Sequence, residues 1–120
     1  MGQVIGVEES PNAVADARFN AGLADNAEFV EGRVEEVLPS LGVPIDLVVL
    51  DPPRQGCASE TLTALTRLTP VKIVYVSCDP ATLARDIRQL VQAGYQLVEV
   101  QPVDMFPQTH HIESVALLRR

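Results

Sequence analysis

Apolar residues in this 120-residue chain fall into short runs separated by segments with helical spacing. Short apolar runs rich in β-branched residues are typical of strands. They predict strands at residues 4–8, 27–31, 45–50, 71–77, 95–103 and 114–118. The runs at 45–50 (IDLVVL) and 71–77 (VKIVYVS) are the most apolar, a pattern typical of strands buried on both faces of a parallel sheet.

Capping residues and helix-ending residues predict helices between these strands. Ser10 followed by Pro11 is a favourable helix start. Asp79 is placed to cap another helix that Gly94 ends, and Pro39 is expected to end a short one. The predicted helices cover 11–22, 34–38, 59–68 and 80–93. No repeat, linker or low-complexity segment separates them, which predicts one domain over residues 1–120.

Strands and helices that alternate at this spacing predict an α/β fold with a doubly wound sheet. In such sheets ligands bind beyond the carboxyl ends of the parallel strands. Asp51 follows one buried run and Cys78 follows the next, so we expect both side chains at one edge of the sheet. Glu113 begins the last strand, and it would lie at the same edge if that strand is antiparallel.

Composition and charge limit the function classes. With 47% hydrophobic residues, the chain can bury a core. Its 16 acidic and 9 basic residues give a net charge of −7, the wrong sign for binding a nucleic-acid backbone unaided. There is no signal peptide and no apolar run that could span a bilayer, and two cysteines provide neither a disulfide framework nor a zinc site. We therefore expect no membrane association and a reducing, cytoplasmic setting with free thiols.

Cys78 has two interpretations. A cysteine after an apolar strand is often a buried structural residue. Cys78, however, precedes Asp79 and Pro80 at a predicted helix start, where the helix dipole favours a thiolate nucleophile. A phosphatase signature, with five residues between cysteine and arginine, is excluded because six residues separate Cys78 from Arg85.

The other polar candidates also have simpler interpretations. Asp51 stands before two prolines, which commonly follow a strand, and Glu113 alone would be read as a solvated strand end. Cys57 has no partner in the pattern and is interpreted as a loop thiol. His110 and His111 point to opposite faces if the chain is extended, so no metal site is predicted.

Three motifs together resemble the C-terminal motifs of the RNA uracil-5 methyltransferase family, which acts on 23S rRNA or tRNA. They are DPPRQG at 51–56, VSCDPATLARD at 76–86 and DMFPQTHHIE at 104–113, in the family's order. GVEESPNAVADARFNA at 6–21 resembles the family's segment after the first strand of its Rossmann-like sheet. Amino-methyltransferases share a similar DPP motif but usually follow it with an aromatic residue; Arg54 in that place favours a carbon target.

The resemblance implies a reaction and roles for the matching residues. Cys78 matches the nucleophile that adds to carbon 6 of uracil, and Glu113 matches the base that removes the proton from carbon 5. Asp51 matches the carboxylate that holds the base, and it is also expected near the cofactor, S-adenosylmethionine. Glu8 matches the acid that binds the cofactor's ribose hydroxyls.

Arg54 and His111 belong to the matching motifs and are expected to position the substrate. The implied partner is an RNA, rRNA or tRNA, whose target base would be turned out of its stack.

The chain also departs from the family pattern. It starts at Met1-Gly2-Gln3, after the place where the family has its first strand and glycine-rich cofactor loop. We therefore expect a partial methyltransferase domain that lacks this strand and is inactive alone, relieving its open sheet edges by closure or as a strand-pairing dimer. The alternatives left open are a non-catalytic α/β binding or scaffold domain and a methyltransferase for another base.

Overall fold

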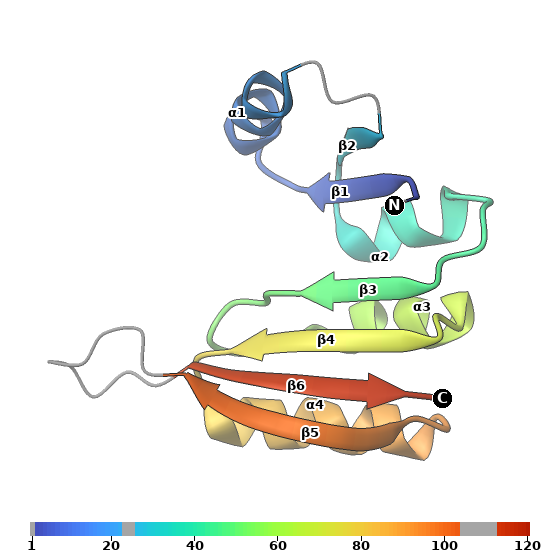
Figure 1. The fold of residues 1–120 in the computed structure, drawn as a ribbon, viewed down its shortest axis with the longest axis vertical. Coiled ribbons are helices and arrows are strands. Elements are labelled where there is room, and N and C mark those ends of the chain that lie inside the picture. The colour runs from blue at the N-terminus through green and yellow to red at the C-terminus, as the bar shows by residue number, and fades with distance from the viewer. Residues whose placement is uncertain (1, 23–25, 104–112) are drawn as a thin grey trace, which may run out of the picture. The chain divides into compact units, whose positions relative to one another are not determined.

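The computed structural model describes residues 2–22, 26–103 and 113–120 (Figure 1). The elements follow one another as β1 (Val4–Glu8), α1 (Pro11–Ala21), β2 (Ala27–Glu31), α2 (Val34–Val37), the 3-10 helix η1 (Leu38–Ser40), β3 (Leu47–Leu50), α3 (Ser59–Leu68), β4 (Lys72–Ser77), α4 (Pro80–Gln92), β5 (Gln96–Val103) and β6 (Glu113–Arg119). This order confirms the predicted α/β class. The contacts divide the chain into two compact units, Met1–Gly42 and Val43–Arg120.

The first unit contains a two-stranded parallel sheet of β1 and β2 with the helix α1 between them in sequence. As predicted, Ser10 caps α1: its Oγ accepts a hydrogen bond from the Ala13 amide at 3.3 Å, and Pro11 occupies the first turn. Gly22 ends the helix with φ of 57°, a left-handed value that glycine adopts without a steric penalty. The Arg18 guanidinium donates to the Phe29 carbonyl at 3.0 Å, which ties α1 to β2.

The second unit is built on a four-stranded sheet with the order β3-β4-β6-β5. Strands β3 and β4 are parallel, whereas β6 is antiparallel to both β4 and β5. In Figure 1, α3 and α4 both lie behind this sheet. On that face Ile73 pairs with Leu118 and Tyr75 with Ala116, and all four side chains are buried.

The prediction that the run at 45–50 is buried on both faces is wrong. The strand β3 is shorter, Leu47–Leu50, and only its alternate residues Val48 and Leu50 share a face with the buried residues of β4. Leu47 and Val49 point to the other face, and they are 52% and 64% exposed. The apolar pattern shows that these side chains can be buried, but no described helix of this unit covers that face.

Two prolines lie inside regular elements, and only the first of them departs from the prediction. The backbone continues past α2 in the 3-10 turn η1, which includes Pro39, so the helical segment does not end at that residue as predicted. Proline is accepted in the first turn of a helix because its missing N–H has no partner there. Pro102 lies in β5, an edge strand of the sheet, where one strand side needs no ladder hydrogen bond.

Candidate active site

Three predicted site residues lie at the ends of three adjacent strands. Leu50, the last residue of β3, pairs with Tyr75, so Asp51 follows the parallel ladder directly. Ser77, the last residue of β4, pairs with Ser114 of β6. Cys78 and Glu113 are therefore the next residues on these two antiparallel strands, at the same edge as Asp51.

The parallel pairing of β3 with β4 and the antiparallel pairing of β4 with β6 meet the conditions under which these residues were expected at one edge. Because neighbouring strands are spaced by about 4.8 Å, Cys78 emerges between Asp51 and Glu113, with about 10 Å between the outer two strands. Cys78 and Glu113 are half-buried, whereas Asp51 is exposed. The edge thus presents a thiol flanked by two carboxyl groups, one of which is open to solvent.

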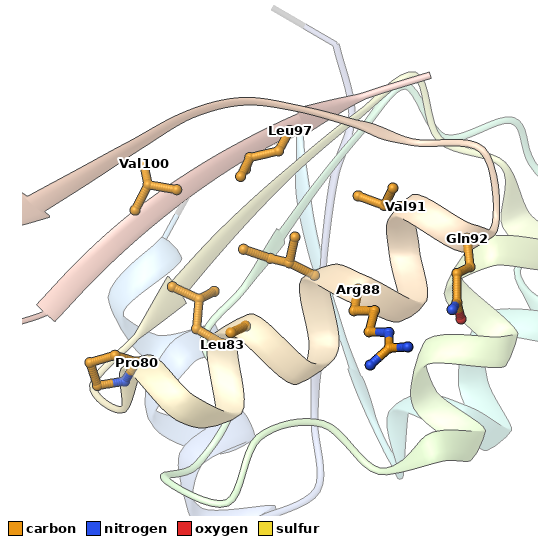
Figure 2. A pocket seen from close by; sticks show the side chains of 9 residues that line it. Pro80, Leu83, Arg88, Val91, Gln92, Leu97 and Val100 are labelled. Atoms are coloured by element: carbon orange, nitrogen blue, oxygen red, sulfur yellow. The ribbon is translucent and has the colours of Figure 1, made fainter.

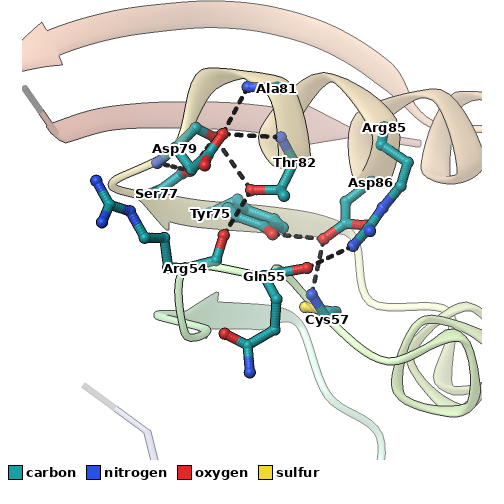
Figure 3. Close-up of polar contacts among 10 residues, drawn as sticks. All are labelled: Arg54, Gln55, Cys57, Tyr75, Ser77, Asp79, Ala81, Thr82, Arg85 and Asp86. Carbon is teal, nitrogen blue, oxygen red and sulfur yellow. Dashed lines mark hydrogen bonds and ion pairs between the residues drawn. The ribbon is translucent and has the colours of Figure 1, made fainter.

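Hydrogen bonds on both sides fix the backbone around Cys78 (Figure 3). The Ser77 hydroxyl donates to the Asp79 carbonyl at 2.9 Å and accepts from the Asp79 amide at 3.1 Å. The Asp79 carboxylate accepts from the amides of Ala81 and Thr82 at 2.9 and 3.2 Å, which confirms it as the cap of α4. Cys78, between the two, is held at the start of this helix as predicted.

The 51–57 loop is attached to α4 through its backbone. The Arg54 carbonyl accepts from the Thr82 hydroxyl at 3.0 Å, and the Gln55 carbonyl accepts from the Arg85 guanidinium at 2.8 Å. The Arg54 side chain itself points away from these contacts in Figure 3 and is exposed. It is thus available to contact a ligand.

A buried carboxylate that the sequence interpretation missed lies beneath this loop. Asp86 is 1% exposed, and its Oδ2 accepts from the Tyr75 hydroxyl at 2.5 Å and from the Cys57 amide at 2.8 Å. Its Oδ1 accepts from Arg85 at 3.1 Å. A signal was present in the sequence: Asp86 occupies a position on the apolar face of α4, between Leu83 and Leu90, which are both buried.

The same surroundings keep two acidic groups protonated. Burial, followed by the nearby Asp86 charge, raises the pKa of the Cys57 thiol from 9.0 to about 11. Burial and the hydrogen bond to Asp86 also raise the pKa of Tyr75. Cys57 is therefore a neutral thiol at physiological pH, and it lies in a loop as the sequence predicts.

Glu8 belongs to the first unit. It is the last residue of β1 and pairs in register with Glu31 of β2. Its Oε1 accepts from the Ser10 amide at 3.1 Å, which orients the carboxylate at the carboxyl end of the strand. Its exposed position at that end suits it to accept hydrogen bonds from ligand hydroxyl groups.

The remaining sequence predictions concern two histidines, metal binding and membrane association. His110 and His111 lie outside the described residues. Within the described ranges, no group of three or more His, Cys, Asp or Glu side chains is arranged to hold a metal ion. In those same ranges no helix has the length and apolar character needed to cross a membrane.

A groove occurs on a different part of the second unit. It lies between α4 and β5, and Figure 2 shows its lining by Leu83, Val91, Leu97 and Val100. This lining is mostly apolar and contains none of the three residues at the strand ends. The groove is therefore not the candidate active site.

Comparison with known proteins decides the family. The model of the tRNA (uracil-5-)-methyltransferase family matches residues 16–120. The chain belongs to this family. One relative is an uncharacterized RNA methyltransferase of Gloeobacter violaceus. It is 52% identical over 119 residues, which are 98% of this chain and 26% of the relative. A second, from Caldanaerobacter subterraneus, is 50% identical and is covered over 27% of its length.

Solved structures support the family fold. The Pyrococcus abyssi tRNA (uracil-54, C5)-methyltransferase, solved with S-adenosyl-L-homocysteine, matches with a TM-score of 0.83 and 39% identity, over 97% of this chain and 28% of that one. A precorrin-6y C5,15-methyltransferase of Geobacter metallireducens matches with a TM-score of 0.77 at 21% identity, which shows the Rossmann-like fold alone. The uracil-5-methyltransferase family chain described here thus spans about a quarter of the length of the curated relatives it matches.

Proposed function

We propose that this chain is the catalytic part of an S-adenosylmethionine-dependent RNA methyltransferase that methylates carbon 5 of uridine. The observation that carries the proposal is the meeting of Asp51, Cys78 and Glu113 at one edge of the sheet. Family membership supports methyl transfer as the reaction class. The proposal extends this to a covalent mechanism and to the role of each residue.

Cys78 is proposed as the nucleophile, because carbon 5 of uracil is too poor a nucleophile to accept a methyl group directly. Its thiolate adds to carbon 6, forming an S–C bond and moving the electron pair of the C5–C6 double bond toward carbon 5 and O4. Carbon 5 then bonds to the methyl group while the bond from that methyl to the donor sulfur breaks. Its position between Asp51 and Glu113 at the edge of the sheet supports this role.

Glu113 is proposed as the base that completes the reaction. It takes the proton from carbon 5, and the electron pair of that C–H bond restores the double bond and expels the Cys78 thiolate. Asp51 is proposed to hold the uracil through hydrogen bonds, and Arg54 and His111 to position the RNA. The exposed guanidinium of Arg54 supports its part of this assignment.

The methyl donor implied by the family is S-adenosylmethionine, which supplies an electrophilic methyl group. Glu8 is proposed to hold its ribose hydroxyls, and Asp51 to lie near it. The Glu8 carboxylate fits this task because one oxygen is fixed by the Ser10 amide while the side chain stays exposed. The two residues belong to different compact units.

The RNA partner is proposed to be rRNA or tRNA in the cytoplasm. A net charge of −7 disfavours phosphate binding by this chain alone. The basic surface that binds the RNA would therefore lie in the parts of the longer relatives that this chain does not match.

We also propose that residues 1–120 form a partial methyltransferase domain that is inactive in isolation. Strands β1 and β3 belong to separate sheets, and each pairs with only one described strand. Val4 on β1 and Val49 on β3 expose apolar side chains, 45% and 64% respectively. Such edges favour pairing with a further strand, either from the longer protein or from a second copy in a strand-pairing dimer.

A chimera tests the proposed function. This chain would replace the matching segment of the Pyrococcus abyssi enzyme, and methylated tRNA would be digested and analysed by mass spectrometry. We expect 5-methyluridine, lost in Cys78→Ala. A methyl group on another base, or no product from a folded chimera that binds the cofactor, would reject the uracil assignment in favour of another base or a non-catalytic domain.

A further inference from the structure

We propose that Asp86 is a positioning residue that holds the 51–57 loop against α4 and so keeps Asp51 beside Cys78. This inference rests on the proposed function, because it treats the loop and the start of α4 as parts of one site. Asp86 itself has no described contact with the residues at the strand ends. Its effect on them would pass through the loop.

The Asp86 carboxylate joins the loop and β4 to its own helix, α4. It accepts from the Cys57 amide in the loop at 2.8 Å, from Tyr75 on β4 at 2.5 Å and from Arg85 on α4 at 3.1 Å (Figure 3). Among the described residues no buried side-chain nitrogen or oxygen lacks a partner, so this network is fully satisfied. Satisfied buried networks of this kind favour one arrangement of the elements they join.

Two neighbouring side chains extend the attachment along the loop. Thr82 donates to the Arg54 carbonyl at 3.0 Å, and Arg85 donates to the Gln55 carbonyl at 2.8 Å. Together with the Cys57 amide, three nearly consecutive backbone groups of the loop are thus bound by side chains from the first two turns of α4. No strand ladder holds this segment.

Gly56 shows how closely the loop approaches this network. Its φ of 82° lies in the left-handed region, and the residue is buried. A Cβ at this position would lie 2.5 Å from Nη2 of Arg85 and 2.7 Å from Oδ2 of Asp86. The loop backbone therefore packs directly on the Arg85–Asp86 pair, and only glycine fits between them.

This attachment links the two halves of the proposed site. The loop leaves β3 at Asp51, while α4 begins two residues after Cys78. The strand ladder fixes one end of the loop, and the contacts with Asp86 and its neighbours fix the other. Without them the loop would be free to move relative to the helix start that holds Cys78.

Hydrogen exchange on the 120-residue chain tests the attachment without a catalytic assay. Asp86→Asn keeps the side-chain size but replaces one acceptor oxygen by a donor NH2 group. The single remaining oxygen cannot accept from both Arg85 and the Cys57 amide of the loop. We expect the amides of 54–57 to exchange about tenfold faster, as for the loss of one charge-assisted hydrogen bond, while α4 stays protected. Glu60→Gln, the same chemical change on an exposed turn of α3, should leave the loop unchanged.

Unchanged loop exchange in Asp86→Asn would overturn the proposal. If this variant fails to fold, Thr82→Val replaces it, since it removes only the hydroxyl that binds the Arg54 carbonyl. Faster exchange at 54–57 is again expected, and wild-type exchange would again be contradictory. Arg85→Lys, which keeps a donor, should protect the loop better than Arg85→Ala.

The functional consequence is tested in the chimera with the Pyrococcus abyssi enzyme. At saturating RNA, Asp86→Asn should slow formation of the Cys78 adduct about tenfold with little change in KM, because the loop orients groups after binding. A wild-type adduct rate in Asp86→Asn would overturn the positioning role. Absence of any adduct in the unmutated chimera, with the expected loop exchange, would instead reject the proposed function and leave the attachment standing.

Discussion

The two compact units of the chain differ in how much core they bury. The larger unit packs α3 and α4 on a four-stranded sheet and buries large side chains from every layer, among them Leu62, Leu65, Ile73, Tyr75 and Leu90. The smaller unit has a two-stranded sheet, and among its described residues the buried apolar ones are Val14, Val37 and Leu38. Two strands alone are marginally stable, so the smaller unit depends more on further contacts.

The proposed chemistry divides along the same line. Asp51, Cys78 and Glu113 all belong to the larger unit, where one continuous ladder sets their spacing. Glu8, the proposed ribose ligand, belongs to the smaller one. The residues proposed to handle the base thus lie together on one sheet of the larger unit, whereas the proposed ribose ligand lies in the smaller unit.

The largest expected effect is on the affinity of the isolated chain for S-adenosylmethionine. We expect the isolated 120-residue chain to bind S-adenosylmethionine no more tightly than about 1 mM, or about 4 kcal/mol, because Glu8 alone would hold the ribose weakly. Isothermal titration calorimetry measures this affinity. Micromolar binding would mean that the chain holds the cofactor without the parts of its longer relatives that it does not match, which would contradict its description as a partial domain.

Core truncations should separate the units energetically. Leu65→Ala removes a fully buried side chain from the larger unit and is expected to cost about 2–5 kcal/mol of unfolding free energy. Val14→Ala in the smaller unit should cost less, since fewer methyl groups are lost. Urea unfolding with residue-resolved hydrogen exchange gives both values. A larger effect for Val14→Ala would contradict the division into a strong and a weak core.

The two cysteines of the larger unit should differ in their rates of alkylation. Cys78 stands at a helix start, whereas burial and Asp86 raise the pKa of Cys57 to about 11. We therefore expect iodoacetamide to alkylate Cys78 at least about tenfold faster near neutral pH. Mass spectrometry of peptides taken over time measures the two rates, and equal rates would count against the nucleophile.

The smallest expected effect is a pH dependence from Cys57. Its thiol ionises near pH 9.0 in the unfolded chain and near pH 11 in the folded one, so the unfolded state binds fewer protons in between. The contribution of this group to stability is therefore complete below pH 9 and falls as the pH rises to 11. Thermal unfolding of the wild type and Cys57→Ser across this range should show a steeper loss in the wild type; parallel curves would contradict it.

The strands and helices could be predicted because apolar runs, caps and glycines act locally, whereas the strand directions were stated only as conditions that the pairing of the strands meets. Ser10 and Asp79 cap the expected helices, and the run before Cys78 forms the expected strand. The exposure of Val49 could not be predicted, because an apolar pattern does not say what covers it. Asp86 was missed because its partners Cys57 and Tyr75 are brought to it only by tertiary packing.

Trapping the covalent intermediate tests the central claim most directly. In the chimera, Glu113→Gln lacks the proposed base, so the Cys78–RNA bond should form, methyl transfer should occur and the adduct should persist on a denaturing gel. Cys78→Ala should form none. Peptide mass spectrometry should place the methylated uridine on Cys78 in Glu113→Gln. An adduct that survives Cys78→Ala, or one attached to Cys57, would contradict the account.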